Sequence, residues 1–375
     1  MAGIYLHIPF CKTRCIYCDF YSTTRNDLRQ RYVRALCREL VLRRDYLRGA
    51  TVETVYFGGG TPSQLTEEDF ESIFQTLQDV YGLEHAREIT LEANPDDLTD
   101  EYVRLLRHFP FNRISMGIQT FDDQTLQLLQ RRHSAAQAIE AVQRCREAGF
   151  KNLNIDLIYG LPGETEEKWK HDLQEAVSLH PEHISAYHLT YEEGTPLYRL
   201  RETHRVNEVN EEDSLRFFTL LVQTLRKAGY VHYEISNFCL PGHHARHNTA
   251  YWQGIPYLGC GPSAHSFDTD SREWNQASLT AYIDGLEKNE RPFEAEKLDN
   301  DTRYNEYVMT GMRTRWGISL EKIATDFGTK RLDYLRQMAH PHLQRGKLIE
   351  KEGRFCLTEE GIFTSDDIIS DLMYV

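Results

Sequence analysis

Three cysteines near the start of the chain have the spacing of a metal centre. Cys11, Cys15 and Cys18 form a C-x3-C-x2-C pattern in one short segment. Three thiolates held this close together can bind a single centre, and three ligands on a [4Fe–4S] cluster leave one iron open for a cofactor or substrate. The spacing alone also allows a zinc site with His7 as the fourth ligand, or a redox-active Cys15–Cys18 dithiol.

A run of glycines forms a second candidate loop. Gly58, Gly59 and Gly60, followed by Thr61, come directly after a short apolar segment at 54–57. Glycine lets a ligand approach the backbone closely and offers N–H groups to it. A glycine run taken alone is also typical of a tight turn. The order of the two motifs, with the glycines one predicted strand after the cysteines, is the stronger indication.

A third pattern, the segment Arg246–Trp252, combines a histidine with flat side chains. Neutral imidazole is a common axial ligand of haem iron, so His247 is a candidate ligand. Tyr251 and Trp252 offer apolar faces that suit a porphyrin, and Asn248 is placed to orient the imidazole or bind a propionate. The alternative is a surface turn whose histidine caps a helix while the aromatic residues fill the core. Further ligands stay open, namely His243, His244, His265, Cys239 and Cys260.

The composition is that of a globular protein. The 375 residues are 40% hydrophobic and 27% charged, and the net charge of −14 disfavours non-specific binding to nucleic acids. We expect no secretory signal and no membrane-spanning helix, because a basic n-region and a long apolar run are both lacking. The eight cysteines of a cytoplasmic chain then indicate metal or redox chemistry rather than disulfides.

Strands alternate with helices through the first half of the chain. We predict strands at 4–9, 54–57, 88–93, 113–117, 153–158 and 183–188, and helices at 29–47, 67–81, 135–148, 166–179 and 211–228. Such alternation predicts a parallel sheet with right-handed crossovers, here an open barrel of about six units. Functional loops gather at the carboxyl ends of parallel strands. Glu92 and Gln119 fall at such ends, and Asp156 lies in the fifth strand.

Three regions follow from these patterns. Residues 1–229 form the barrel, and residues 230–299 form a connecting region rich in aromatic residues and histidine. Residues 300–375 read as helices at 305–314, 320–327 and 332–344, followed by a hairpin that turns at Gly353. Helices followed by a hairpin indicate a small winged-helix-like module. The acidic balance and the lack of a basic recognition helix favour a docking role over DNA binding.

Together these motifs resemble the radical S-adenosylmethionine (SAM) family and, within it, the oxygen-independent coproporphyrinogen III oxidase-like group. The resemblance covers nearly the whole chain and rests on IYLHIPFC, YFGGGTPS, GIQTF, NIDLIYGLPGET and the tail. It implies an α/β fold, a partial (β/α)6 barrel with a small α+β winged-helix-like C-terminal domain. It also implies a [4Fe–4S] cluster and S-adenosylmethionine as cofactors.

The resemblance assigns roles to individual residues. Cys11, Cys15 and Cys18 match the ligands of three irons of the cluster. The residues that match contacts to S-adenosylmethionine are Tyr5, Gly59, Gly60, Thr61, Glu92, Gln119, Arg131 and Asp156. A carboxylate beside a sulfonium or a ribose hydroxyl is chemically reasonable, as a charge partner or a bidentate acceptor.

Two branches of this group differ in features that the sequence shows. The oxidase branch carries a further cysteine where Phe20 stands, and an N-terminal extension before the first cysteine, which is here residue 11. The motif around His247 resembles HNxxYW of the haem-chaperone branch. The expected function is therefore to bind haem through His247 and pass it to acceptor haem proteins at the cytoplasmic membrane face. Monomer and homodimer both stay open.

Two other functions are weighed against this one. An enzyme would use the cluster and S-adenosylmethionine to oxidise a substrate such as coproporphyrinogen III, with decarboxylation of its propionate chains. A zinc-binding interaction protein would use the cysteines for structure alone. Anaerobic turnover distinguishes the first alternative, and metal analysis distinguishes the second.

Overall fold

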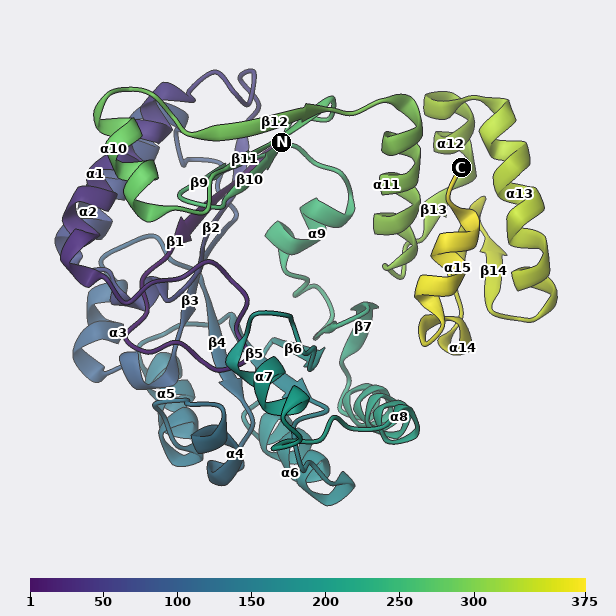
Figure 1. The fold of residues 1–375 in the computed structure, drawn as a ribbon, viewed down its shortest axis with the longest axis horizontal. Coiled ribbons are helices and arrows are strands. Elements are labelled where there is room, and N and C mark those ends of the chain that lie inside the picture. Colours follow the sequence, from purple (N-terminus) through teal and green to yellow (C-terminus); the bar gives the residue numbers. More distant parts are fainter.

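The computed structural model describes residues 1–375 and is built around one twelve-stranded sheet (Figure 1). Its six central strands lie in chain order and run parallel, as predicted. They are β1 (Ala2–Ile8), β2 (Val52–Gly59), β3 (Glu88–Ala93), β4 (Arg113–Gln119), β5 (Leu153–Tyr159) and β6 (His183–His188). All six predicted strands are confirmed, and β3 and β6 have the predicted bounds.

Helices lie between successive strands of this set and after β6, and the longer ones cover the outer face of the sheet (Figure 1). They are α1 (Arg29–Leu42), α2 (Glu67–Tyr81), α3 (Asp100–Leu106), α4 (Asp123–Leu128), α5 (Ala135–Glu147), α6 (Glu166–Ser178), α7 (Pro196–Glu202) and α8 (Glu211–Lys227). The five predicted helices are confirmed. Helix α2 begins at its predicted residue because Thr66 and Asp69 form a capping box.

The two faces of the central strands differ in chemistry. Alternate residues of β1, namely Ile4, Leu6 and Ile8, lie in a buried apolar core of 55 residues beneath the helices. Tyr5 and His7 alternate with them and face the other side, the lumen of the partial barrel. The same alternation repeats on the neighbouring strands, and the lumen therefore carries many polar side chains. They include Thr54, Tyr56, Glu88, Glu92, Arg113, Ser115, Asn154, Asp156 and His183.

Residues 230–299 extend the sheet at both edges. On one edge β8 (Asn237–Cys239) and β7 (Val231–Glu234) follow β6. On the other, β9 (Tyr257–Cys260) pairs parallel with β1 and continues into β10 (His265–Phe267), β11 (Ser271–Asn275) and β12 (Phe293–Lys297). Two helices, α9 (Arg246–Trp252) and α10 (Leu279–Glu287), complete this region. The predicted boundaries between the three regions stay a prediction.

The C-terminal residues form a second small sheet with its own core of 14 residues (Figure 1). Its elements are α11 (Asn300–Met312), β13 (Ile318–Ser319), α12 (Leu320–Phe327), α13 (Thr329–Gln344), β14 (Leu348–Lys351), β15 (Arg354–Leu357), α14 (Glu359–Ile362) and α15 (Ser365–Leu372). The predicted hairpin at Gly353 is confirmed, whereas the sequence did not reveal β13 or α15. No helix anywhere combines the length and apolar character that a bilayer span requires.

Candidate functional site

The three motif cysteines lie on the irregular segment between β1 and α1, at the carboxyl end of the first strand. Cys11 is buried and accepts a hydrogen bond from the Thr61 hydroxyl at 3.3 Å, and Cys15 accepts one from the Arg131 guanidinium, also at 3.3 Å. Burial raises the pKa of Cys11, and it raises the pKa of Cys18 to about 11. Metal binding would therefore have to displace thiol protons. The guanidinium beside Cys15 fits an anionic iron–sulfur centre.

The zinc alternative lacks its fourth ligand. His7 is buried, and its ring nitrogens lie 2.8 Å from the Tyr21 carbonyl oxygen and 3.1 Å from the Tyr5 hydroxyl. No set of three or more His, Cys, Asp or Glu side chains is arranged to hold one metal ion. A cluster distributes its thiolates over different irons, so it does not require the sulfurs to converge on one point. The donor set fits a cluster better than a Cys3His site.

The glycine run does not follow the strand as predicted: Gly58 and Gly59 end β2, paired with His7 and Ile8 of β1, and Gly60 begins the glycine loop. The Gly59 N–H donates to Glu92 at 3.2 Å, and the Gly60 N–H donates to the Ile8 carbonyl at 2.8 Å. A Cβ atom on Gly59 would lie 2.7 Å from the His7 ring, and Gly59 has a φ of 105°. The Gly59 and Gly60 N–H groups, which were candidates for binding a ligand, therefore already have partners within the protein. Glycine is needed here because the two strands approach closely.

Two half-buried acids, Glu92 on β3 and Asp156 on β5, lie on the lumen side of the sheet beneath this loop. Glu92 accepts a hydrogen bond from the Tyr56 hydroxyl at 2.7 Å, and Asp156 accepts hydrogen bonds from Asn154 at 2.6 Å and Ser115 at 3.3 Å. Burial raises the pKa of Glu92 to about 7 and also raises that of Asp156, and the charge of Asp156 adds to the shift of Glu92. A cationic ligand here would favour the ionised acids.

A bulge in β4 gathers a third group of predicted residues. The pairing of β4 with β5 shifts between Gly117 and Gln119, and Gln119 has a φ of 74°, which is rare for a residue with a side chain. The Arg131 guanidinium donates to Asn94 at 2.7 Å and to the Gly117 carbonyl. A Cβ on Gly117 would meet the Gln119 and Arg131 side chains. The bulge thus brings Gln119 and Arg131 together beside Cys15.

The HNxxYW segment forms helix α9, at the opposite end of the lumen from the cysteines. His247 is 1% exposed and sits at the amino ends of β2 and β3, where Glu88 accepts the N–H groups of Arg246 and His247. The His247 ring nitrogens lie 2.8 Å from the Thr54 hydroxyl and 2.8 Å from the Tyr251 hydroxyl. Burial lowers the pKa of His247 to about 3, so the ring is neutral. Both nitrogens already have protein partners.

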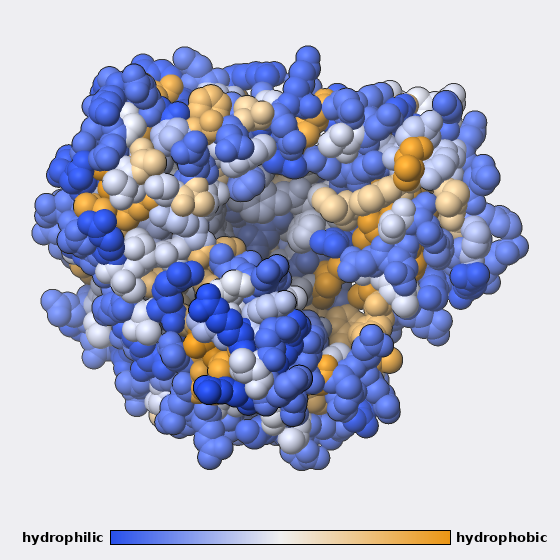
Figure 2. Space-filling model, in the orientation of Figure 1, coloured by the Kyte–Doolittle hydropathy of each residue, from blue (hydrophilic) through white to orange (hydrophobic).

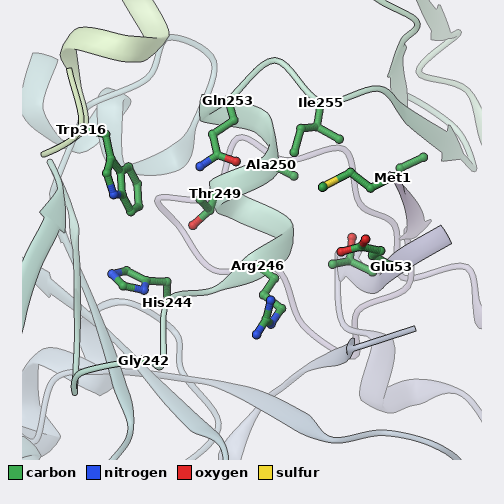
Figure 3. Close-up of a pocket in the computed structure, with 12 residues that line it drawn as sticks. Met1, Glu53, Gly242, His244, Arg246, Thr249, Ala250, Gln253, Ile255 and Trp316 are labelled. Carbon is green, nitrogen blue, oxygen red and sulfur yellow. The ribbon is translucent and has the colours of Figure 1, made fainter. Parts of the chain in front are cut away.

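The other faces of α9 border two cavities between the barrel and the C-terminal domain. Figure 2 shows the surface hollowed near its centre. One cavity, which we name the mouth cavity, has a volume of about 560 Å³. Its lining is Tyr187, Glu234, Ile235, Ser236, Asn237, Asn248, Tyr251, Trp252, Arg313, Ser365 and Asp366. A smaller cavity of about 250 Å³ lies on the face of α9 that carries Arg246, Thr249 and Gln253, opposite Trp316 and His244 (Figure 3).

The structure groups the predicted site residues into two sets. The cysteine triplet, Thr61, Gln119 and Arg131 lie at the carboxyl ends of the strands, and Tyr5, Glu92 and Asp156 line the lumen below. His247 lies at the amino ends, stacked on Tyr56 with ring centroids 5.1 Å apart. Sequence reasoning missed Tyr56, Asn94 and Arg313. Alternation with apolar residues along β2 could have identified Tyr56, whereas Asn94 and Arg313 carry no local signal.

The alternative haem ligands named from the sequence are spread over several environments. Cys239 in β8 and Cys260 in β9 are fully buried within the sheet. His265 is exposed and stacks on Trp274. His244 is half-buried and packs edge-on against Tyr233, with ring centroids 4.8 Å apart. None of these side chains lines the mouth cavity.

Comparisons with known proteins agree with this architecture. The model of the radical SAM superfamily matches residues 5–176, and that of the HemN C-terminal domain matches residues 298–364. The heme chaperone HemW of Mycobacterium tuberculosis is 34% identical, covering 99% of this chain and 94% of that one. The heme chaperone HemW of Bacillus subtilis is 30% identical, covering 98% of each chain.

A solved structure shows the same fold. The coproporphyrinogen III oxidase HemN of Escherichia coli, a radical SAM enzyme, superposes with a TM-score of 0.87. The alignment covers 99% of this chain and 90% of that one at 24% sequence identity. The mixed α/β radical SAM fold and its small C-terminal domain are thereby confirmed.

Proposed function

We propose that this chain, which belongs to the heme chaperone HemW family on the radical SAM scaffold, binds haem and passes it to acceptor haem proteins. The observation that carries the proposal is the position of α9. This helix presents Asn248, Tyr251 and Trp252 of the HNxxYW motif to the mouth cavity. A cavity of about 560 Å³ is within the usual size range of ligand pockets, roughly 300–1,000 Å³.

The chemistry of the mouth cavity supports a porphyrin ligand. Trp252 and Tyr187 supply flat side chains, and aromatic faces bury a large apolar area. The Arg313 guanidinium pairs with Asp366 at 3.0 Å and keeps a buried Nε without a hydrogen-bond partner. A guanidinium is the preferred partner of a carboxylate such as a haem propionate. Burial raises the pKa of Glu234 to about 7, which reduces repulsion between this acid and the propionates near neutral pH.

The carboxyl ends of the strands would hold the resident cofactors. We assign Cys11, Cys15 and Cys18 to a [4Fe–4S] cluster. We assign S-adenosylmethionine to the surrounding residues, which are Tyr5, Gly59, Gly60, Thr61, Glu92, Gln119, Arg131 and Asp156. When bound, this pair supplies one-electron chemistry. Arg131 offsets the charge of the Cys15 thiolate, while Glu92 and Asp156 present carboxylates to a cationic group. The proposed acceptors include haem proteins at the cytoplasmic membrane face.

The test is transfer of haem from the loaded protein to a haem-free acceptor enzyme, measured by recovery of acceptor activity. We expect transfer faster than from free haem at the same concentration. Absence of saturable haem binding would contradict the proposal. Anaerobic conversion of coproporphyrinogen III to protoporphyrinogen, coupled to cleavage of S-adenosylmethionine, would instead establish the enzymatic alternative.

The role of the cluster is tested separately with Cys18→Ala. We expect this variant to lose the iron–sulfur absorption of the anaerobically purified protein and to deliver haem more slowly. The matched control is Cys356→Ala, which removes a half-buried thiol from β15 and should leave the absorption unchanged. Unchanged haem delivery by Cys18→Ala would show that the cluster takes no part in transfer.

A further inference from the structure

His247 has no free nitrogen with which to bind iron. Its ring stacks on Tyr56 and lies close to Gly3. A Cβ atom added to Gly3 would lie 3.1 Å from the imidazole. Thr54 and Tyr251 occupy its two nitrogens, and Glu88 holds its backbone N–H. The imidazole would have to leave this buried position to reach haem iron. The motif must therefore meet the iron through another residue, or α9 must unfold.

Tyr251 lies between His247 and the mouth cavity. It stands four residues after His247 on α9, so the two side chains share one face of the helix. Its hydroxyl is 2.8 Å from His247 Nε2, and its half-buried side chain lines the cavity together with Asn248 and Trp252. Tyr251 is the residue of the motif that both contacts the histidine and borders the cavity.

We infer that the Tyr251 phenol oxygen is the protein ligand of haem iron, and that His247 is a positioning residue that holds this oxygen by a hydrogen bond. The inference rests on the proposed function. Tyrosine is an established haem ligand, and a second residue bonded to a ligand orients it and tunes the metal. As the Fe–O bond forms, the phenol O–H bond breaks, its proton passes to solvent, and the iron releases a bound water. No electron is transferred.

This assignment specifies the oxidation state of the cargo. A phenolate is an anionic oxygen donor and stabilises ferric iron more than ferrous iron. The predicted ligand is therefore ferric haem, with its propionates toward Arg313 and its ring beside Trp252. The histidine and the tyrosine of the motif, four residues apart on α9, would then act together to present one phenol oxygen to the iron.

The test titrates the full-length, cluster-loaded protein with ferric haem and follows both affinity and spectrum. Tyr251→Phe removes only the hydroxyl, so the ring packing is kept. We expect it to abolish the phenolate-to-iron charge-transfer band and to weaken binding by at least about tenfold, equivalent to about 1.4 kcal/mol. His247→Gln should keep a phenolate-type spectrum but shift the charge-transfer band. Tyr257→Phe, which alters the ring packed edge-on against Tyr251, is the matched control and should behave as wild type.

The outcomes separate this inference from the proposed function. One result would overturn the inference while the haem-carrier function stands. In it, the wild-type protein gives the spectrum of imidazole-ligated haem, Tyr251→Phe leaves that spectrum unchanged, and His247→Gln abolishes it. No saturable binding by the wild-type protein would overturn both. The iron–sulfur absorption and the far-ultraviolet circular dichroism of each variant verify that the fold is intact. Loss of the phenolate band in a folded Tyr251→Phe protein supports the inference.

Discussion

Glu164 shows, at the scale of one residue, how burial couples the fold to pH. It lies in the loop after β5, where its carboxyl group accepts the N–H groups of Gly160 at 2.6 Å and Leu161 at 3.1 Å. Burial raises its pKa to about 8. The folded state therefore holds a proton that the unfolded chain releases above the ordinary pKa of a glutamate, about 4.3.

This raised pKa predicts that the contribution of Glu164 to stability is lost as the pH rises. Its contribution is fully present below about pH 4.3 and falls until about pH 8, because the unfolded state binds fewer protons over this range. Glu164→Gln should flatten the dependence of the free energy of unfolding on pH between 5 and 8, and should stabilise the protein at pH 8. Urea unfolding at several pH values measures both effects.

The control for this prediction is Glu167→Gln, which alters an exposed acid near the start of α6. Its unfolding should follow the wild-type pH dependence. If Glu164→Gln also followed the wild-type curve, Glu164 would be ionised in the folded protein and the two N–H groups would outweigh burial.

At the scale of secondary-structure elements, Glu39 attaches α1 to the edge of the sheet. This fully buried carboxylate accepts hydrogen bonds from Gly261 N at 2.9 Å, Asn275 Nδ2 at 2.9 Å and the Tyr282 hydroxyl at 2.6 Å. Arg43, one turn later and directly after α1, forms an ion pair with it at 3.5 Å. One acid thus joins α1 to the loop after β9, to β11 and to α10.

Removing Glu39 should destabilise the protein strongly. Glu39→Ala leaves the three buried donors without this acceptor, although Arg43 keeps its ion pair with Glu273 at 3.0 Å. At about 1–3 kcal/mol for each unsatisfied group, we expect a loss of about 3–5 kcal/mol in the free energy of unfolding. Glu71→Ala, at an exposed position on α2, is the control and should change stability by less than about 0.5 kcal/mol. Denaturant unfolding measures both. A loss below about 1 kcal/mol for Glu39→Ala would mean that water replaces the carboxylate.

At the scale of the whole molecule, the mouth cavity lies between two separate apolar cores. One core of 55 residues belongs to the sheet and its helices, and one of 14 residues belongs to the C-terminal domain. The connections between them include a hydrogen bond of 2.9 Å from Arg315 N to the Tyr233 carbonyl and a bridge between Glu234 and Thr314. Tyr187 and Trp252 border the cavity from one side and Arg313 from the other.

Haem should therefore couple the unfolding of the two parts. A ligand that binds only the folded protein adds about 2.7 kcal/mol to the free energy of unfolding when its concentration is 100 times its Kd. A ligand that contacts both domains stabilises both of them. We expect calorimetry to show a higher Tm and closer unfolding transitions with ferric haem. Arg313→Ala should melt like the wild type without haem and gain less from it. An equal gain in both proteins would place haem away from the C-terminal domain.

Much of the fold could be predicted from the sequence because its signals are local. Strand β3 and helix α2 have their predicted bounds, since apolar periodicity and a capping box act over a few residues. The cysteine triplet needs only one loop to bring its thiols together. The family resemblance, carried by contiguous motifs, therefore identified the scaffold.

Only the tertiary structure decided how distant segments meet. Three features depend on residues far apart in sequence. They are the pairing of β9 with β1, the burial of Glu39, and the hydrogen bond between His247 and Thr54. Side-chain type alone does not specify such contacts, because one histidine can serve as an exposed ligand or as a buried hydrogen-bonding group. The sequence determined that HNxxYW carries a histidine and a tyrosine four residues apart. Packing determined that the tyrosine, and not the histidine, borders the mouth cavity.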